Sequence, residues 1–386
     1  MSSVQNSPLP QGPEKKREKL EKTCPYLDTI NRNLIDFDFE KLCSISLATQ
    51  NVYACLVCGR YFQGRGPKSH AYTHSLQLNH YVFLNLETKK FYCLPENYEF
   101  FDTSLEDIIY LLDPKYAKED LEQLNTGRIC RAFDGSIYHP GIIGVNNIKA
   151  NDYSSVVLLA LAHITIIRDY FLHEIQDKKL FLSKKNLSEV SLDPRAQLVL
   201  RFGQLLRKIW NMHLFKSHIS PHEMLQLVSK LSKGKFQFTK QSDPLEFIVW
   251  FMNNLDAGLK LLTGKKSTLI SKNFSGSLRV TKQKIPLPDL SEKEVKKLLK
   301  TDDYQEKQSV HRFYTLPIDL PAVPLYPNQK HDFQVPKQSL SSLLKKFDGK
   351  QIIEEKTYRE IFHKKFTILD LPKYLIIFYK VHVILQ

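Results

Sequence analysis

The feature that most constrains the fold of this chain is a cluster of cysteines and histidines in its first quarter. Cys55-x2-Cys58 is followed closely by His70, His74 and His80. A Cys-x2-Cys pair places two thiolates on a tight turn, and two later histidines can complete a tetrahedral zinc site. Because a closed site with four protein ligands is structural, its zinc contributes folding energy rather than catalysis. The cluster predicts a small zinc-stabilised module.

Spacing alone leaves two ligand sets open. Gly66 and Pro67 lie just before the first histidine, where a DNA-reading finger needs its helix, and both residues break helices. This weakens the ligand set Cys55, Cys58, His70 and His74, which would make a sequence-specific nucleic-acid finger. The other ligand set is Cys55, Cys58, His74 and His80.

Composition places the chain among ordinary globular proteins, with 386 residues, 42% hydrophobic and 25% charged. That length allows two domains. A net charge of +14 suggests nucleic acid or acidic partners without specifying either. Five of the six cysteines stand beside the histidines, which favours metal over disulfides. We see no signal peptide and no apolar run of about 18 residues, so we expect an intracellular protein without a membrane partner.

The order of segments predicts an α+β protein. A disordered charged arm is expected at 1–22, a zinc module at 23–120, a linker at 121–135 and a second domain at 136–386. In the second domain the patterns favour helices first and strands later. The expected helices span 160–172, 196–210 and 221–231, and the expected strands span 274–281, 312–320 and 374–378.

A Gly/Asn-rich stretch at 144–153 leads into the apolar run 156–162. Such a turn presents a side chain at a helix N-terminus, where unpaired N–H groups and the helix dipole favour negative charge. A thiolate nucleophile would sit there. The residue at that place is Asp152, which can cap the helix but cannot supply a thiolate.

This stretch resembles the catalytic-cysteine box of the ubiquitin-specific proteases. Gly144, Val145, Asn147 and Tyr153 fall on its Gly, Leu, first Asn and Tyr. The resemblance implies a papain-like domain with palm, thumb and fingers. It also implies that Asp152 occupies the nucleophile position and that Asn147 occupies the oxyanion-type position, so no catalytic residue is expected.

Residues 24–98 resemble the zinc finger of the same family, known as the UBP type. The resemblance selects one structural zinc held by Cys55, Cys58, His74 and His80. In members with several zinc ions, a second site would use positions that are here Cys43, Ser46, Gln63 and His70, and the resemblance implies that this site is lost.

Members that bind ubiquitin grip its C-terminal carboxylate with an Arg and aromatic residues of this finger. Arg65 falls on the Arg, but Gly66 stands at an aromatic position and Tyr92 replaces the usual Trp. We therefore do not expect ubiquitin binding.

One later motif continues the family order, and another is missing. Gln241-Ser-Asp243-Pro-Leu-Glu246-Phe247 resembles the Gln-x-Asp-x-x-Glu-Phe box and predicts the start of a helix. Active members also carry a Gly-His-Tyr box that supplies the general base. The printed chain reaches Gln386 without it, which predicts a shortened end, and we interpret His382 as a strand residue. The resemblance thus implies that nucleophile and base are both missing.

The stretches 24–32 and 146–153 match the catalytically inactive branch of this family that serves pre-mRNA splicing. This resemblance implies a nuclear, non-enzymatic splicing factor that supports assembly or stability of the tri-snRNP. Its expected partners are tri-snRNP proteins, with small nuclear RNA nearby. The alternative is a ubiquitin-binding protein or a weakly active deubiquitinase.

Overall fold

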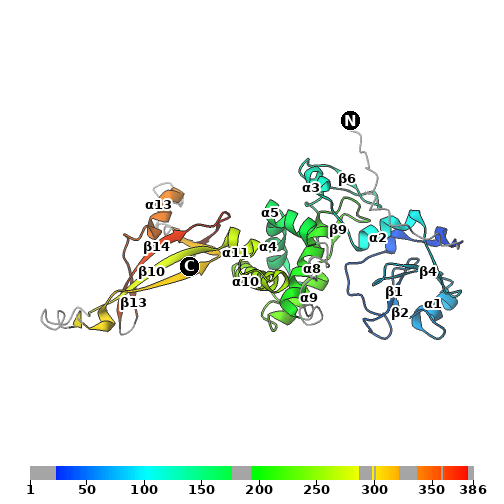
Figure 1. Cartoon of the computed structure of the whole chain (residues 1–386), viewed down its shortest axis with the longest axis horizontal. Coiled ribbons are helices and arrows are strands. Elements are labelled where there is room, and N and C mark those ends of the chain that lie inside the picture. The colour runs from blue at the N-terminus through cyan, green and yellow to red at the C-terminus, as the bar shows by residue number, and fades with distance from the viewer. Residues whose placement is uncertain are drawn as a thin grey trace, which may run out of the picture. The chain divides into compact units, whose positions relative to one another are not determined.

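The structure, a computed structural model, describes residues 23–175, 193–286, 298–299, 301–320, 337–357 and 360–380. The chain forms two compact units (Figure 1). The first comprises Met1–Ile248 and Ala257–Thr263, and the second comprises Val249–Asp256 and Gly264–Gln386. Helices and sheets are mixed in an α+β fold, which confirms the expected class.

The first unit begins with a five-stranded antiparallel sheet in the order β2-β1-β3-β4-β5. Alternation along β1 places Val52 and Ala54 in one apolar cluster and Tyr53 and Cys55 in another, so both faces of the sheet are buried. The strands are β1 (Val52–Cys55), β2 (Tyr61–Gln63), β3 (Val82–Asn85), β4 (Phe91–Cys93) and β5 (Tyr98–Phe100), with helix α1 (His70–Leu78) between β2 and β3.

A helical body follows in the same unit. Its helices are α2 (Glu106–Leu112), α3 (Lys118–Leu124), α4 (Asp152–Ala162), α5 (Thr165–Asp169), a π-helical turn η4 (Tyr170–Glu174), α8 (Pro194–Ile209), α9 (His222–Leu231) and the two ends of α10 (Pro244–Thr263), whose middle part Val249–Asp256 is assigned to the second unit. The 3-10 turns η1 (Leu27–Thr29), η2 (Arg32–Leu34) and η3 (Thr103–Leu105) precede them. Two short ladders complete the unit: β6 (Cys130–Arg131) with β7 (Ile137–Tyr138), antiparallel, and β8 (Gly144–Val145) with β9 (His218–Ile219), parallel.

The helix expected over 160–172 is broken in the structure. Helix α4 ends at Ala162, Ile164 takes an extended backbone conformation, and α5 begins at Thr165. The indole Nε1 of Trp210, from the end of α8, donates a hydrogen bond to the Ala162 carbonyl at 3.1 Å. A tertiary donor thus satisfies a carbonyl at the helix C-terminus, which local sequence patterns do not reveal.

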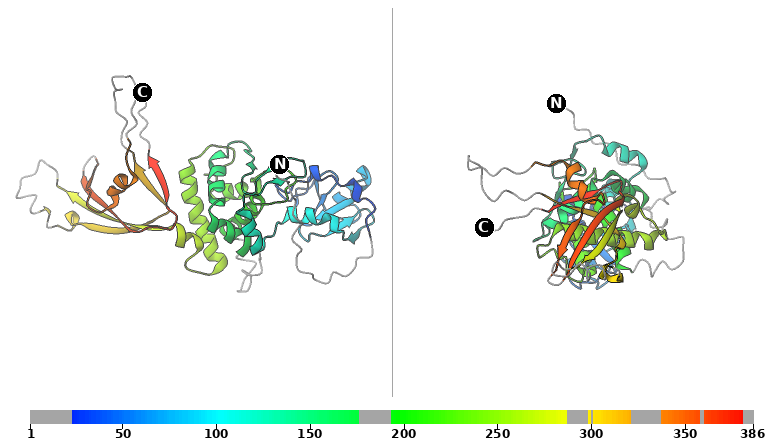
Figure 2. Two further views of the ribbon diagram at one scale, coloured as in Figure 1. Left: turned by 90° about the horizontal axis from the view of Figure 1, so that it is seen from above. Right: turned by 90° about the vertical axis from the view of Figure 1, so that its left-hand side faces the viewer.

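The second unit contains a four-stranded antiparallel sheet in the order β11-β10-β14-β13. Its strands are the yellow to red ribbons of Figure 2. The strand expected over 312–320 is two strands in different sheets, because β11 ends at Phe313 and β12 begins at Thr315. Leu316, Ile318 and Phe347 form one core cluster of this unit. The elements are α11 (Leu269–Phe274), β10 (Gly276–Ile285), η5 (Asp302–Tyr304), β11 (Lys307–Phe313), β12 (Thr315–Asp319), α13 (Leu340–Leu344), η6 (Lys345–Phe347), β13 (Ile353–Lys356), β14 (Ile361–Asp370) and β15 (Ile376–Lys380), the last paired in parallel with β12.

Among the described residues, no single helix is both long and apolar enough to cross a membrane. Helix α4 and the segment 165–174, which are bent by 85° relative to each other, are together long and apolar enough for a membrane span, but only by length and composition.

Candidate metal centre and the Asp152 loop

The backbone of the finger positions the Cys-x2-Cys turn. Cys55 ends β1, and the N–H of Gly59 donates to the Cys55 carbonyl at 2.9 Å, which closes the turn around Cys58. Gly59 has a φ of +74°, and a Cβ atom there would lie 2.0 Å from the Leu34 carbonyl oxygen. The turn therefore needs glycine for both its conformation and its close packing.

The structure brings Cys55, Cys58, His74 and His80 together, with their ligand atoms within 4.8 Å of one another. Cys55 Sγ lies 3.6 Å from His80 Nδ1, and Cys58 Sγ lies 3.5 Å from His74 Nε2. The two histidine nitrogens are 3.1 Å apart. Around a tetrahedral zinc, ordinary bond lengths give separations of about 3.5 Å for sulfur to nitrogen and about 3.3 Å for nitrogen to nitrogen. The donor set therefore fits one zinc ion.

The surroundings of these donors favour metal binding. The hydrogen bond between the two thiols lowers the pKa of Cys58 and raises that of Cys55, so the pair gives up its first proton from Cys58. Burial lowers the pKa of His74, so its imidazole stays neutral and can donate a lone pair. The ring of Phe62 stacks on His74 with centroids 4.1 Å apart, and this contact fixes the orientation of the ligand.

The other cysteines and histidine of the finger lie outside this cluster. His70 is the first residue of α1 and does not belong to the four-residue group. Cys43 Sγ accepts hydrogen bonds from the Ser46 N–H at 3.4 Å and the Ile45 N–H at 3.5 Å. Ser46 Oγ donates to Gln63 Oε1 at 3.0 Å. Hydrogen bonds among these positions thus join residues that would otherwise surround a second metal.

Arg65 and Tyr92 meet on the finger surface. The Arg65 guanidinium lies 4.4 Å from the centroid of the Tyr92 ring, and its Nη1 donates to Asn97 Oδ1. The ring and the amide therefore hold the guanidinium within the finger. Sequence reasoning identified both residues but not the contact with Asn97, because Asn97 belongs to no motif.

The loop before Asp152 is stabilised by asparagine side chains. Asn151 is fully buried, and its Oδ1 accepts from the Ile148 N–H at 2.6 Å. Its Nδ2 donates to the Asn146 carbonyl at 3.1 Å, while its own N–H donates to Asn147 Oδ1 at 3.0 Å. Asn147, assigned by resemblance to the oxyanion-type position, is thus a structural acceptor here. These contacts shape the loop without using residue 152.

Asp152 is the first residue of α4 and is exposed. Its Oδ2 accepts a hydrogen bond from Gln241 Nε2 at 2.9 Å, and this bond lowers the pKa of the carboxyl group. The next residue, Tyr153, is buried edge-on against Phe247 of α10, with centroids 5.5 Å apart. The two family motifs therefore meet in space at both positions.

The Gln241 motif also starts α10 as expected. Asp243 Oδ1 accepts from the Leu245 N–H at 2.8 Å, and α10 begins at Pro244. This arrangement joins a side-chain cap to a proline in the first turn, which is a common helix start.

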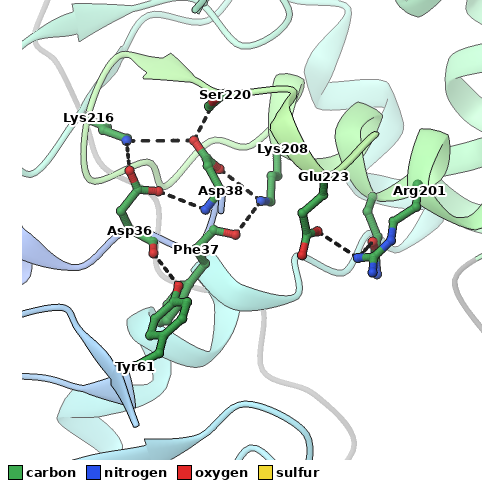
Figure 3. A network of polar contacts seen from close by, with 10 residues as sticks. Asp36, Phe37, Asp38, Tyr61, Arg201, Lys208, Lys216, Ser220 and Glu223 are labelled. Atoms are coloured by element: carbon green, nitrogen blue, oxygen red, sulfur yellow. Dashed lines mark hydrogen bonds and ion pairs between the residues drawn. The ribbon is translucent and has the colours of Figure 1, made fainter. Parts of the chain in front are cut away.

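An acidic segment ties the finger to the helical body (Figure 3). Asp38 is almost fully buried, and its Oδ1 pairs with Lys208 Nζ at 2.9 Å. Asp36 Oδ2 pairs with Lys216 Nζ at 2.5 Å. Lys208 also donates to the Phe37 carbonyl at 2.8 Å. The sequence pattern at 36–43 predicts a turn leading into a strand, but this segment lies outside the strands that the structure describes, and residues 36–39 form this contact instead.

The acidic segment continues toward the Asp152 loop. Asp38 Oδ2 accepts from the Ser220 N–H at 2.8 Å, directly after β9. Strand β9 pairs with β8, and the Asn146 N–H donates to the Ile219 carbonyl at 2.9 Å. A continuous set of contacts therefore runs from the finger to the loop. Sequence reasoning missed it because the lysines lie 170 to 180 residues from their partners.

The chain combines a five-stranded finger with a four-donor metal centre, a helical body and a unit with a four-stranded sheet. These features define a zinc-finger protein of the ubiquitin-hydrolase class. Residues 43–105 match the family described as "Zn-finger in ubiquitin-hydrolases and other protein". Residues 143–382 match the family described as "Ubiquitin carboxyl-terminal hydrolase". The chain belongs to the ubiquitin carboxyl-terminal hydrolase family, which confirms the resemblance found in the sequence.

Two relatives and one solved structure are among the proteins that are similar to this chain. The Mus musculus protein named "Ubiquitin carboxyl-terminal hydrolase 39" is 51% identical over 92% of this chain and 62% of its own length. "Pre-mRNA-splicing factor SAD1" of Saccharomyces cerevisiae is 30% identical over 95% of this chain and 73% of its own. The solved structure called "Crystal structure of an essential yeast splicing factor" has a TM-score of 0.64 and 29% identity, covering 92% of this chain and 76% of that one. The chain thus spans about three fifths of the mouse relative.

Proposed function

We propose that this protein is a non-enzymatic pre-mRNA splicing factor that supports assembly or stability of the tri-snRNP in the nucleus. The observation that carries the proposal is the similarity to a named yeast splicing factor in both sequence and fold. Within the proposal, the finger and the protease-like body act as a scaffold, and Cys55, Cys58, His74 and His80 hold one structural zinc.

The chemistry of the Asp152 loop supports a role without catalysis. Acyl transfer in a cysteine protease needs a thiolate and a base that accepts its proton. Asp152 offers a carboxylate, and the contact that the structure gives it is an amide from Gln241. Attack by this carboxylate on an amide would form an anhydride, a higher-energy acyl intermediate than a thioester. The helix start therefore positions a group unsuited to the reaction.

Affinity purification tests the scaffold proposal. Tagged full-length chain would be recovered from nuclear extract, with mass spectrometry and RNA analysis of what co-purifies. We expect tri-snRNP proteins and their small nuclear RNAs. Recovery of ubiquitin conjugates without splicing proteins would overturn the proposal. A parallel assay with a ubiquitin-amide reporter should show no cleavage above background, and cleavage at the rate of an active family member would contradict the non-enzymatic part.

The second candidate is a ubiquitin receptor, favoured by the contact between Arg65 and Tyr92. An arginine beside an aromatic ring can bind a carboxylate. Against this candidate, Arg65 already donates to Asn97 within the finger. Titration with free ubiquitin decides the matter, with Arg65→Ala as the matched variant. Binding that this substitution abolishes would establish the receptor.

The segment boundaries stay predictions: an arm at 1–22, the finger at 23–120, a linker at 121–135 and the protease-like domain at 136–386. The arm and His382 lie outside the described residues. Limited proteolysis of the full chain would locate the exposed connections, and we expect early cleavage at the arm and at the linker.

A further inference from the structure

One face of the four-stranded sheet changes character along its length. Alternate residues of a strand share a face, so Leu278, Val280, Lys282 and Lys284 of β10 point to the same side. Near the start of β10, Leu278 packs against the core cluster that contains Phe347. Toward the other end the face carries lysines. The apolar part is explained by packing, whereas the basic part needs another explanation.

The strand register aligns three of these basic residues in one row. Lys282 of β10 lies directly opposite Lys307 of β11 and directly opposite Lys364 of β14. Neighbouring strands are about 4.8 Å apart, and like charges directly opposite one another destabilise a sheet. Folding therefore does not favour this row, which we call the lysine row.

Nearby carboxylates only partly balance the charge. Lys364 Nζ pairs with Glu355 at 2.6 Å, and Lys284 Nζ pairs with Glu360 at 2.7 Å. In the described ranges, neither Lys282 nor Lys307 forms an ion pair. The basic end of the face thus keeps a positive excess, and an anionic partner would relieve its repulsion.

Aromatic rings lie among these lysines. Lys282 Nζ is 3.6 Å from the centroid of the Phe362 ring, and Lys284 Nζ is 5.3 Å from that of Tyr304. Both rings are half-buried. A basic surface interleaved with aromatic rings is typical of proteins that bind single-stranded nucleic acid, because phosphates contact the cations and bases stack on the rings. An acidic protein segment would use the cations but not the rings.

We propose that the lysine row binds single-stranded RNA, with Lys282, Lys307 and Lys364 on phosphates and a base in the place that the Lys282 ammonium holds over the Phe362 ring. The inference deepens the proposed function, because it rests on that function for RNA rather than DNA as the ligand. It assigns RNA binding to the sheet unit and not to the zinc finger.

Fluorescence anisotropy of the full-length chain with a fluorescein-labelled 20-nucleotide oligouridine tests this assignment over a series of salt concentrations. The row variant is Lys282→Gln, Lys307→Gln and Lys364→Gln together. The matched control changes the same number of exposed lysines in the same unit: Lys345→Gln, Lys350→Gln and Lys373→Gln. We expect the row variant to raise Kd at least about tenfold. Loss of three phosphate contacts should also lower the slope of log K against log salt by about 2.

Phe362→Leu isolates the stacking contribution, because leucine keeps apolar bulk and removes the ring. We expect Kd to rise at least about fivefold, with the salt slope unchanged. The row variant should melt no lower than the unmodified chain, since it removes repulsion. An equal loss of binding in the row variant and the control would overturn the proposal. So would displacement of the RNA by polyglutamate at equal charge concentration, which would point to an acidic protein. Either failure leaves the co-purification result unchanged, so the splicing proposal and the RNA surface fail separately.

Discussion

The metal centre and the Asp152 loop are built alike, since each uses a tight turn and a helix to place functional side chains. They differ in their reactive groups: the metal centre has a complete donor set, whereas the loop has its shape but no thiol. In the finger, four donors converge at distances that suit zinc. In the loop, the asparagine hydrogen bonds are formed, yet the residue at the helix start is a carboxylate bonded to an amide. The comparison teaches that the shape of a site can be independent of its reactive group when other residues hold that shape.

Removing a zinc ligand should give the largest effect and would show that the finger depends on its donors. We expect His80→Ala to reduce bound zinc from one per chain to near none. Because structural zinc contributes on the order of 10 kcal/mol or more to folding a small domain, the finger should unfold. Metal analysis of the purified protein and a thermal melt measure the two results.

His70→Ala is the matched control for this substitution, since His70 lies four residues before His74 on α1 but outside the donor cluster. It should keep its zinc and its melting temperature. If His70→Ala lost the metal while His80→Ala kept it, the ligand set would be the one of a nucleic-acid finger.

A substitution in the acidic segment, at Asp38, should give the next largest loss of stability. Asp38→Ala leaves Lys208 without its partner in a nearly buried position, and breaking a buried pair costs about 3–5 kcal/mol. Urea unfolding followed by tryptophan fluorescence measures the loss. Glu354→Ala removes an exposed carboxylate that pairs with Lys356, and it should leave the midpoint almost unchanged. Equal shifts for both variants would mean that the buried pair contributes no more to stability than the exposed one.

Placing a thiol at position 152 tests whether the loop lacks only its nucleophile. We expect Asp152→Cys to fold normally, because the loop contacts do not use residue 152. We also expect no cleavage of a ubiquitin-amide reporter, since a thiol needs a base and Gln241 cannot accept its proton. An active member of the family serves as the positive control. Cleavage by the variant would show that the loop had lost only its nucleophile.

Local sequence patterns predicted most of the secondary structure and motifs discussed above. The features that they did not predict depend on contacts between residues distant in sequence. The α+β class and the helix starting at Pro244 were predictable because their signals are short-range. The break after Ala162 was not, because the hydrogen bond from Trp210 comes from another helix. The same holds for Asp38, whose lysine partners are distant in sequence.

Within the candidate site, the sequence motifs identified the residues, but only the folded structure shows which of them are in contact. The contact between Gln241 and Asp152 joins two motifs that spacing alone cannot bring together. Asn147 was assigned an oxyanion-type position by resemblance, and its structural hydrogen bond to Asn151 becomes visible only when the loop is folded.

The smallest expected effect concerns the acidity of Asp152. Its pKa is lowered by the hydrogen bond from Gln241, so Gln241→Ala should raise it toward the ordinary value near 3.8. A depressed carboxyl pKa stabilises the fold above the unfolded-state pKa, and this contribution is lost as pH falls through the folded value. The variant should therefore lose slightly less stability than the unmodified chain on acidification below about pH 4. Carbon-13 NMR titration of the carboxyl group measures the pKa directly, with Gln237→Ala as the control, because the Gln237 amide donates to Gly234 instead. An unchanged pKa in Gln241→Ala would assign the depression to the backbone amides at the start of α4. The helix start itself would then hold the negative charge, as it would hold a thiolate in an active relative.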